Sequence, residues 1–152
     1  MRLLQIMTVI AFGTLLAACG DNAEQLQAQQ ETWEEMMEVH DEVMPKMGEI
    51  SRLRRELTAK MEALDSTETE QIETIDATLA QLDGADIGMM DWMGDLQQLS
   101  TLRENNSHDE IMAYLEQEKE KVQKVKENML SAIEAGKQML DSFGEDTEQN
   151  EE

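Results

Sequence analysis

Apolar positions recur every three or four residues along most of this chain, which is the spacing of one face of an α-helix. The first stripe of this kind consists of Trp33, Met36, His40, Val43, Met47, Ile50, Leu53, Leu57, Met61 and Leu64. Pro45 lies inside it, and a proline normally breaks or kinks a helix at a cost of about 3 kcal/mol. Because the stripe stays in phase on both sides of Pro45, we predict one long helix with a kink near residues 41–45.

A second stripe begins after a polar turn, where Thr67 and Glu70 have the spacing of a helix-capping box. Its members are Ile72, Ile75, Leu79, Leu82, Asp86, Met89, Met93 and Leu96. Gly84, Gly88 and Gly94 weaken this helix by up to about 1 kcal/mol each relative to alanine. A break near Gly84 is therefore the competing prediction.

A third stripe follows residues 101–107, which we predict to form a polar connection. Ser107 and Glu110 repeat the capping-box spacing, and Gly144 stands where a glycine commonly ends a helix. The stripe consists of Met112, Leu115, Val122, Val125, Met129, Ile133, Leu140 and Phe143. Three long amphipathic helices with short links predict an all-α, up-down-up antiparallel bundle over residues 31–144.

The composition agrees with this fold class, because strong helix formers are abundant and aromatic residues make up only 3% of the chain. The 34 acidic and 12 basic residues give a net charge of −22. Binding to phosphates depends on Lys and Arg, so this charge argues against nucleic acid and anionic membrane surfaces as partners. Residues 145–152 form an acidic tail without apolar residues, which we predict to be disordered.

The start of the chain has a different pattern, in which Arg2 precedes an apolar run over residues 3–16. A membrane-spanning or buried core helix is one interpretation, but the run is shorter than the roughly 20 residues that a spanning helix needs. The run ends in Leu16-Ala17-Ala18-Cys19. This segment resembles the signal peptide and lipobox of bacterial lipoprotein precursors, in which a leucine and two small residues precede an obligatory cysteine.

The resemblance implies that residues 1–18 are a signal peptide and that the sulfur and amine of Cys19 carry lipid. Several acyl chains would give a stable anchor that a single chain does not. Gly20 follows the cysteine, which by resemblance to sorting rules in some Gram-negative bacteria implies the outer membrane, facing the periplasm. We predict residues 19–30 to be a polar tether. Cys19 is the only cysteine, so the mature domain forms no disulfide and no thiolate metal site.

Thirteen methionines occur in the chain, and seven of them fall in two short windows. The first window holds His40 with Met36, Met37, Met44 and Met47, and the second holds Trp92 with Met89, Met90 and Met93. If the first hairpin turns at residues 65–66, His40 lies level with residue 91. The two windows are therefore expected to meet at one height of the bundle.

Thioether and imidazole are ligands that soft Cu(I) selects. His40, Met37 and Met44 occupy one helix face, and Met89 or Met93 could complete a ligand set. Trp92 could cap such an ion through the face of its ring. The sequence thus suggests a Cu(I) or other soft-metal site as one hypothesis.

The competing hypothesis is a hydrophobic core, since methionine is a flexible filler of irregular helical cores. In that case His40 is a satisfied core histidine, hydrogen-bonded to Asp86 or Asp91, and Trp92 fills space opposite Gly84 or Gly88. A methionine-lined groove that receives a partner helix, as in an envelope chaperone or adaptor, is a third hypothesis.

The remaining chemistry-bearing groups indicate less. Four lysines interrupt the acidic chain at Lys119, Lys121, Lys124 and Lys126, which indicates a solvated helix face or a docking patch for an acidic partner. No Ser–His–Asp context points to nucleophilic catalysis, and the spacing of acids around residues 83–86 does not match a calcium-binding loop.

Residues 33–57 together with Met89-Met90-Asp91-Trp92-Met93 resemble a set of small helical bacterial lipoproteins, some of which carry the label "viral A-type inclusion protein". The first of these stretches contains His40-Asp41-Glu42-Val43-Met44-Pro45-Lys46-Met47. The resemblance implies coiled-coil composition and suggests that the two methionine windows belong together. We therefore expect a membrane-anchored, non-enzymatic helical-bundle lipoprotein that acts as a binding or structural module.

Overall fold

A computed structural model describes the backbone of residues 2–149 and the side chains of residues 22–143. The chain is all-α, as predicted, and the described backbone contains no strand. Five α-helices and one short 3-10 helix follow one another: α1 (Arg2–Val43), η1 (Met44–Lys46), α2 (Met47–Ala63), α3 (Thr69–Asp95), α4 (Leu99–Asn105) and α5 (His108–Gln149).

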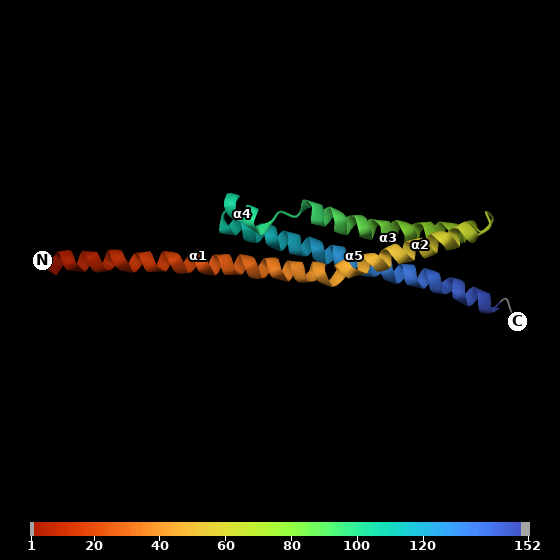
Figure 1. The fold of residues 1–152 in the computed structure, drawn as a ribbon, viewed down its shortest axis with the longest axis horizontal. Helices are drawn as coiled ribbons and strands as arrows, with labels where there is room; N and C mark the ends of the chain where they lie inside the picture. Colours follow the sequence, from red (N-terminus) through yellow and green to blue (C-terminus); the bar gives the residue numbers. More distant parts are fainter. Residues whose placement is uncertain (1, 150–152) are drawn as a thin grey trace.

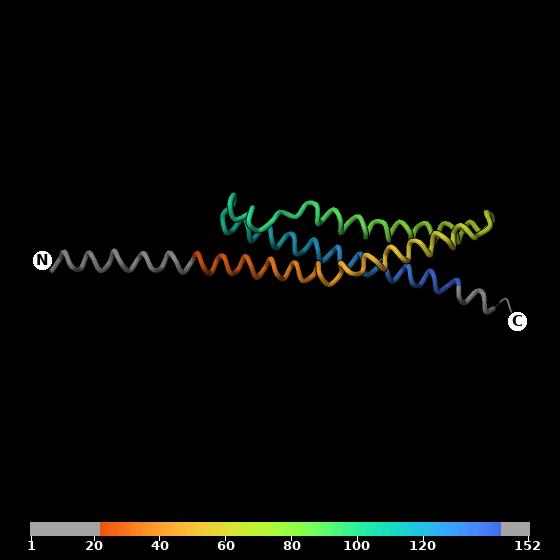
Figure 2. The backbone as a smooth tube through the Cα atoms, in the orientation of Figure 1, coloured from red at the N-terminus to blue at the C-terminus, as the bar shows by residue number. Residues whose placement is uncertain are grey.

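The helices lie lengthwise beside one another, and α5 contacts α1, α2, α3 and α4 (Figure 1). The tube trace in Figure 2 shows that α2 continues the course of α1, that α3 returns beside α2, and that α5 runs back again. The second methionine window, on α3, is thereby brought back to the level of the end of α1.

The first long helix is interrupted at Pro45. Where we predicted one kinked helix, α1 ends at Val43, a 3-10 turn spans Met44–Lys46, and α2 begins at Met47. Proline has no N–H to donate, and its ring clashes with the preceding turn of an α-helix. The 3-10 turn at residues 44–46 accommodates the proline without ending the course of the two helices. The apolar stripe still continues, with Val43 and Ile50 fully buried on either side.

The connection expected at residues 101–107 is partly helical, and this part of the prediction is wrong. Leu99 and Leu102 are buried on α4, where they form a small second core with Ile111 and Leu115 of α5. The backbone N–H of Gln97 donates to the Tyr114 hydroxyl at 2.8 Å. Burial of two leucines three residues apart therefore stabilises a helix in a segment whose other residues are polar.

One of the two predicted capping boxes is confirmed. The N–H of Ser107 donates to the Glu110 carboxylate at 2.8 Å, and the N–H of Glu110 donates to Ser107 Oγ at 3.4 Å. The box predicted at Thr67 is wrong: the N-cap residue of α3 is Glu68, which makes no side-chain capping hydrogen bond, and Asp65 stabilises the turn that precedes it. The Asp65 N–H donates to the Glu68 carboxylate at 2.7 Å, while Asp65 Oδ1 accepts from the N–H of Thr67 at 3.0 Å.

The main core follows the three stripes. Its fully buried members from them are Met36, Val43, Ile50, Leu53, Leu57, Ile75, Leu82, Met89, Val122 and Met129. No break occurs at Gly84, since α3 is continuous from Thr69 to Asp95. Gly136 allows close helix approach: a Cβ at this position would lie 3.2 Å from Leu53 Cδ1 and 3.4 Å from Leu82 Cδ1.

Part of the segment predicted as a tether packs on the bundle. Gln29 is buried, its amide oxygen accepts from Arg103 Nε at 2.9 Å, and its amide nitrogen lies 3.2 Å from His108 Nδ1. Arg103 also donates to the carbonyl oxygen of Leu26 at 2.9 Å. These contacts hold α1 to α4 and to the start of α5.

Both ends of the chain lie outside the described side chains. The lipobox-like residues around Cys19 and the acidic tail at residues 145–152 both fall there, while α5 extends to Gln149, beyond the expected end at Gly144. Within the part of the chain whose side chains are described, no helix is long and apolar enough to span a membrane.

Candidate functional site

His40 lies in the last turn of α1, where its side chain is 13% exposed. Its Nδ1 is 2.8 Å from the Asp41 carboxylate. Because a carboxylate accepts, Nδ1 carries the hydrogen, and in a neutral ring Nε2 then keeps its lone pair. Nε2 is buried and has no hydrogen-bond partner among the described residues.

The hydrogen-bond partner expected for His40 was Asp86 or Asp91, and this expectation is wrong. The imidazole bonds to its own neighbour along the helix, and Asp86 instead lies 3.9 Å from the Arg54 guanidinium. A second acidic residue, Asp83, also pairs with Arg54. Arg54 of α2 therefore pairs with Asp83 and Asp86 of α3, and the carboxylate that bonds to His40 comes from Asp41 on its own helix.

Trp92 lies beside His40. The hairpin turn predicted residue 91 at this level, so the prediction is correct to within one residue. The two ring centroids are 5.8 Å apart and the ring planes are inclined by 35°. Trp92 is buried, and its indole Nε1 also has no hydrogen-bond partner among the described residues. The expectation that Trp92 fills space opposite Gly84 or Gly88 is wrong, since no side chain lies within 4 Å of a Cβ placed at either glycine.

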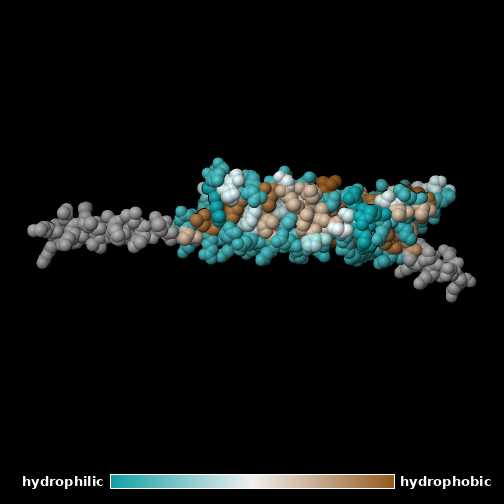
Figure 3. Space-filling model, in the orientation of Figure 1, coloured by the Kyte–Doolittle hydropathy of each residue, from teal (hydrophilic) through white to brown (hydrophobic). Residues whose placement is uncertain are grey.

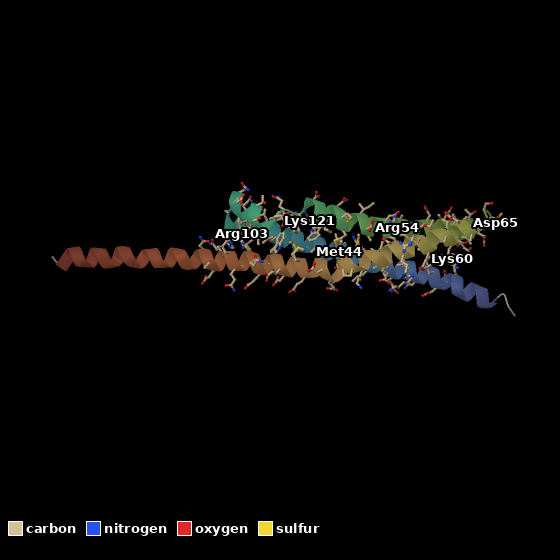
Figure 4. All side chains as sticks on the ribbon, viewed as in Figure 1. Met44, Arg54, Lys60, Asp65, Arg103 and Lys121 are labelled. Atoms are coloured by element: carbon tan, nitrogen blue, oxygen red, sulfur yellow. The ribbon has the colours of Figure 1, made fainter. Side chains whose placement is uncertain are left out.

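The methionines divide into two groups. Met89 is fully buried, and Met37 and Met44 are partly buried against the same core that contains Trp92. Met93 is 38% exposed and lies outside this core. The structure therefore places Met37, Met44 and Met89 in or against the core that contains Trp92, and it leaves Met93 on the surface. Figure 4 shows Met44 midway along the bundle, at the junction of α1 and α2.

Hard metal ligands do not complete the site. Among residues 22–143, no three His, Cys, Asp or Glu side chains are arranged so that they could hold a metal ion. A metal ion at His40 would therefore depend on thioether sulfurs for its other ligands. This restricts the chemistry to soft ions, because carboxylate-rich sites suit the harder ones.

Glu118 is a polar residue of this region that the sequence argument did not single out. It is buried on α5, where one carboxylate oxygen accepts from Lys121 Nζ at 2.7 Å and the other has no partner in the described structure. Glu118, Trp92 and Val125 line a hollow of about 380 Å³ between α3 and α5. The sequence did contain a signal for the burial of Glu118, because this acidic residue lies at helical spacing from the apolar positions 115, 122 and 125.

Two of the four lysines join α5 to α1, so these two are not free on a solvated face. Lys119 pairs with Glu35, and Lys126 Nζ lies 2.6 Å from the Glu42 carboxylate. The hydrogen bond from Lys119 to Glu35 raises the pKa of Lys119 above its usual value. Both pairs are separated by 84 residues along the chain, so α1 and α5 run parallel at this level.

Comparison of the chain with protein-family models, with curated protein sequences and with solved structures gave no match. The buried polar groups between α1, α3 and α5 are the candidate functional groups of this protein.

Proposed function

We propose that this protein is a lipid-anchored component of the cell envelope whose helical bundle binds a ligand without transforming it. The observation that carries the binding function is the pair of buried ring nitrogens, His40 Nε2 and Trp92 Nε1, which have no partner in the described structure. Leaving a buried polar group unpaired costs about 1–3 kcal/mol. A ligand at this place would recover part of that cost, whereas a purely structural bundle gains nothing from it.

The anchoring function rests on the sequence. The cationic Arg2, the apolar run and the Leu16-Ala17-Ala18-Cys19 ending support cleavage before Cys19 and lipidation of that cysteine. Gly20 at the next position supports sorting to the outer membrane, with the domain facing the periplasm. The net charge of −22 favours cationic ligands and disfavours anionic ones.

In this proposal the bundle has three arms that run up, down and up: α1, η1 and α2 form the first, bent arm, α3 forms the second, antiparallel arm, and α5 forms the third. The bend at Pro45 then adjoins the ligand site, since Met44 and His40 stand on either side of the end of α1. A bend at this place would leave irregular space that methionine side chains can line.

The anchoring function is tested with a Cys19→Ser variant. The wild-type protein should partition into the detergent phase, carry acyl groups by mass spectrometry and fractionate with outer membranes. The variant should keep its leader and lose the lipid. A wild-type protein without acyl groups would refute the anchoring function and leave the binding function to be judged separately.

Exposed apolar residues on α3 favour a second candidate function, an envelope chaperone or adaptor that holds a partner helix. Ile87 is 56% exposed and Met90 is 53% exposed, one turn further along the same helix. Most of the surface seen in Figure 3 is hydrophilic, with apolar areas scattered between the polar ones. This function predicts that a photo-crosslinker at position 90 captures one defined envelope protein, and that Ile87→Glu abolishes the crosslink. A crosslinker at the exposed position 76 provides the control.

A further inference from the structure

We infer that the ligand of this site is a single Cu(I) ion, held by His40 Nε2 and the thioether sulfurs of Met44 and Met89 against the ring of Trp92. This inference rests on the proposed binding function and names its ligand. It is independent of the lipid anchor, because none of the four residues belongs to the leader.

The state of His40 is that of a metal ligand. A metal-binding histidine usually donates its second ring N–H to a carboxylate or carbonyl, which orients the ring and directs the other nitrogen to the metal. Here Nδ1 donates to Asp41 at 2.8 Å, and Nε2 is buried without a partner in the described structure. The side chain of Asp41 is 74% exposed, so a carboxylate in contact with water orients a ring that is itself largely buried.

The register of α1 and α3 places two thioethers on the same side of the His40–Trp92 pair. Met44 follows His40 by four residues, and Met89 precedes Trp92 by three, so each lies about one helical turn away. The two helices run in opposite directions (Figure 1), so both steps lead the same way along the bundle. Met89 is fully buried and Met44 is partly buried against the core that contains Trp92.

The ligand types select Cu(I). One imidazole and two thioethers are soft, uncharged donors, which suit Cu(I) and leave Mg²⁺, Ca²⁺ and Mn²⁺ without the oxygen ligands they prefer. The face of an indole attracts a cation within about 6 Å of the ring. His40 lies against this ring, with 5.8 Å between centroids. In this proposal, an ion bound to Nε2 contacts the face of the indole.

The test is an anaerobic titration with Cu(I) in competition with a chromophoric Cu(I) chelator. The full-length chain is used in detergent micelles with Cys19→Ser, because an unlipidated thiol at the only cysteine would take the metal itself. We expect this protein to withhold one equivalent of Cu(I). His40→Phe keeps an aromatic ring against Trp92 and removes the lone pair, so it should weaken binding by at least about 10–100-fold, the loss typical of removing a group that only orients a ligand.

Matched controls separate the site from the other residues of the same kind. His108→Phe changes the other histidine, and Met129→Leu changes a fully buried methionine of the same core; neither should alter the affinity for Cu(I). Met44→Leu together with Met89→Leu should weaken the affinity for Cu(I).

As a second measurement, Cu(I) should quench the fluorescence of Trp92 in a Trp33→Phe background, which leaves Trp92 as the sole tryptophan.

Two outcomes would overturn the inference. The first is release of all Cu(I) to the chelator by a protein whose circular dichroism shows the folded helical state. The second is equal uptake by the parent and by His40→Phe. Either result leaves the lipid anchor unaffected, since acylation of Cys19 is measured separately on the wild-type protein.

Discussion

The imidazole of His40 and the indole of Trp92 lie with their ring centroids 5.8 Å apart, and each ring has a buried nitrogen without a partner in the described structure. In the metal-free protein these nitrogens destabilise the fold. We therefore expect His40→Phe to raise the free energy of unfolding by about 1 kcal/mol, since it removes a buried unpaired polar atom and keeps the ring packing. Urea denaturation measures this difference.

The comparison variant for that prediction is His40→Ala, which removes the polar atom and the ring together. It should be less stable than His40→Phe, because it leaves a void beside Trp92. A His40→Phe protein that is less stable than the parent would mean that Nε2 is paired in the folded state, for example with a buried water molecule.

Two helical glycines should respond in opposite ways to a larger side chain. No atom lies within 4 Å of a Cβ placed at Gly84, so Gly84→Ala should stabilise α3 by about 1 kcal/mol. Gly136 faces Leu53 and Leu82, so Gly136→Val should destabilise the bundle by about 1–3 kcal/mol through overpacking. Thermal unfolding of both variants checks this pair. Stabilisation by both substitutions would contradict the close approach of the helices at Gly136.

Swapping the two charged residues of the Glu42–Lys126 ion pair should preserve its contribution to stability. The carboxylate and Nζ are 2.6 Å apart, and the lysine side chain is the more buried of the two. Glu42→Lys or Lys126→Glu alone places like charges together and should lower stability, whereas the double exchange should recover about 0.5–1 kcal/mol. A double-mutant cycle measures this coupling energy. Strict additivity would contradict the parallel placement of α1 beside α5.

The cap of α5 should make the bundle sensitive to acid. Hydrogen bonds from the Oγ and N–H of Ser107 hold the pKa of Glu110 below its usual value of 4.5. Because the folded-state pKa is the lower one, this stabilisation is complete above the unfolded value and is lost as the pH falls through the folded value. The unfolding temperature of the parent should therefore decrease when the pH is lowered below about 4.5.

Glu110→Gln is the matched variant for the pH prediction, since glutamine also serves in capping boxes and does not titrate. The difference in unfolding temperature between parent and variant should be largest near neutral pH and should shrink as the pH is lowered. A difference that stays constant from neutral to acid pH would show that the ionisation of Glu110 does not contribute to stability.

The sequence by itself determined the helical class, most of the buried positions and the cap at Ser107. These features depend on residues within about four positions of one another, because helical periodicity and capping are local. The level at which His40 meets α3 also followed from the position of the hairpin turn, to within one residue. The stripe through Met36, Ile50 and Leu57 is buried as its spacing predicted.

Only the tertiary structure decided how these local elements are completed. Leu99 and Leu102 form a helix because Ile111 and Leu115 cover them, which no local pattern shows. Met93 is exposed although it belongs to the same stripe as Met89, because Trp92 and Leu96 are the residues that α3 contributes to the core at this level. Lys126 bonds to a residue 84 positions away, and His40 bonds to its neighbour instead of to an acid on α3. Each of these outcomes depends on which helices lie side by side, since long-range packing determines which side chains are buried and which polar groups find partners.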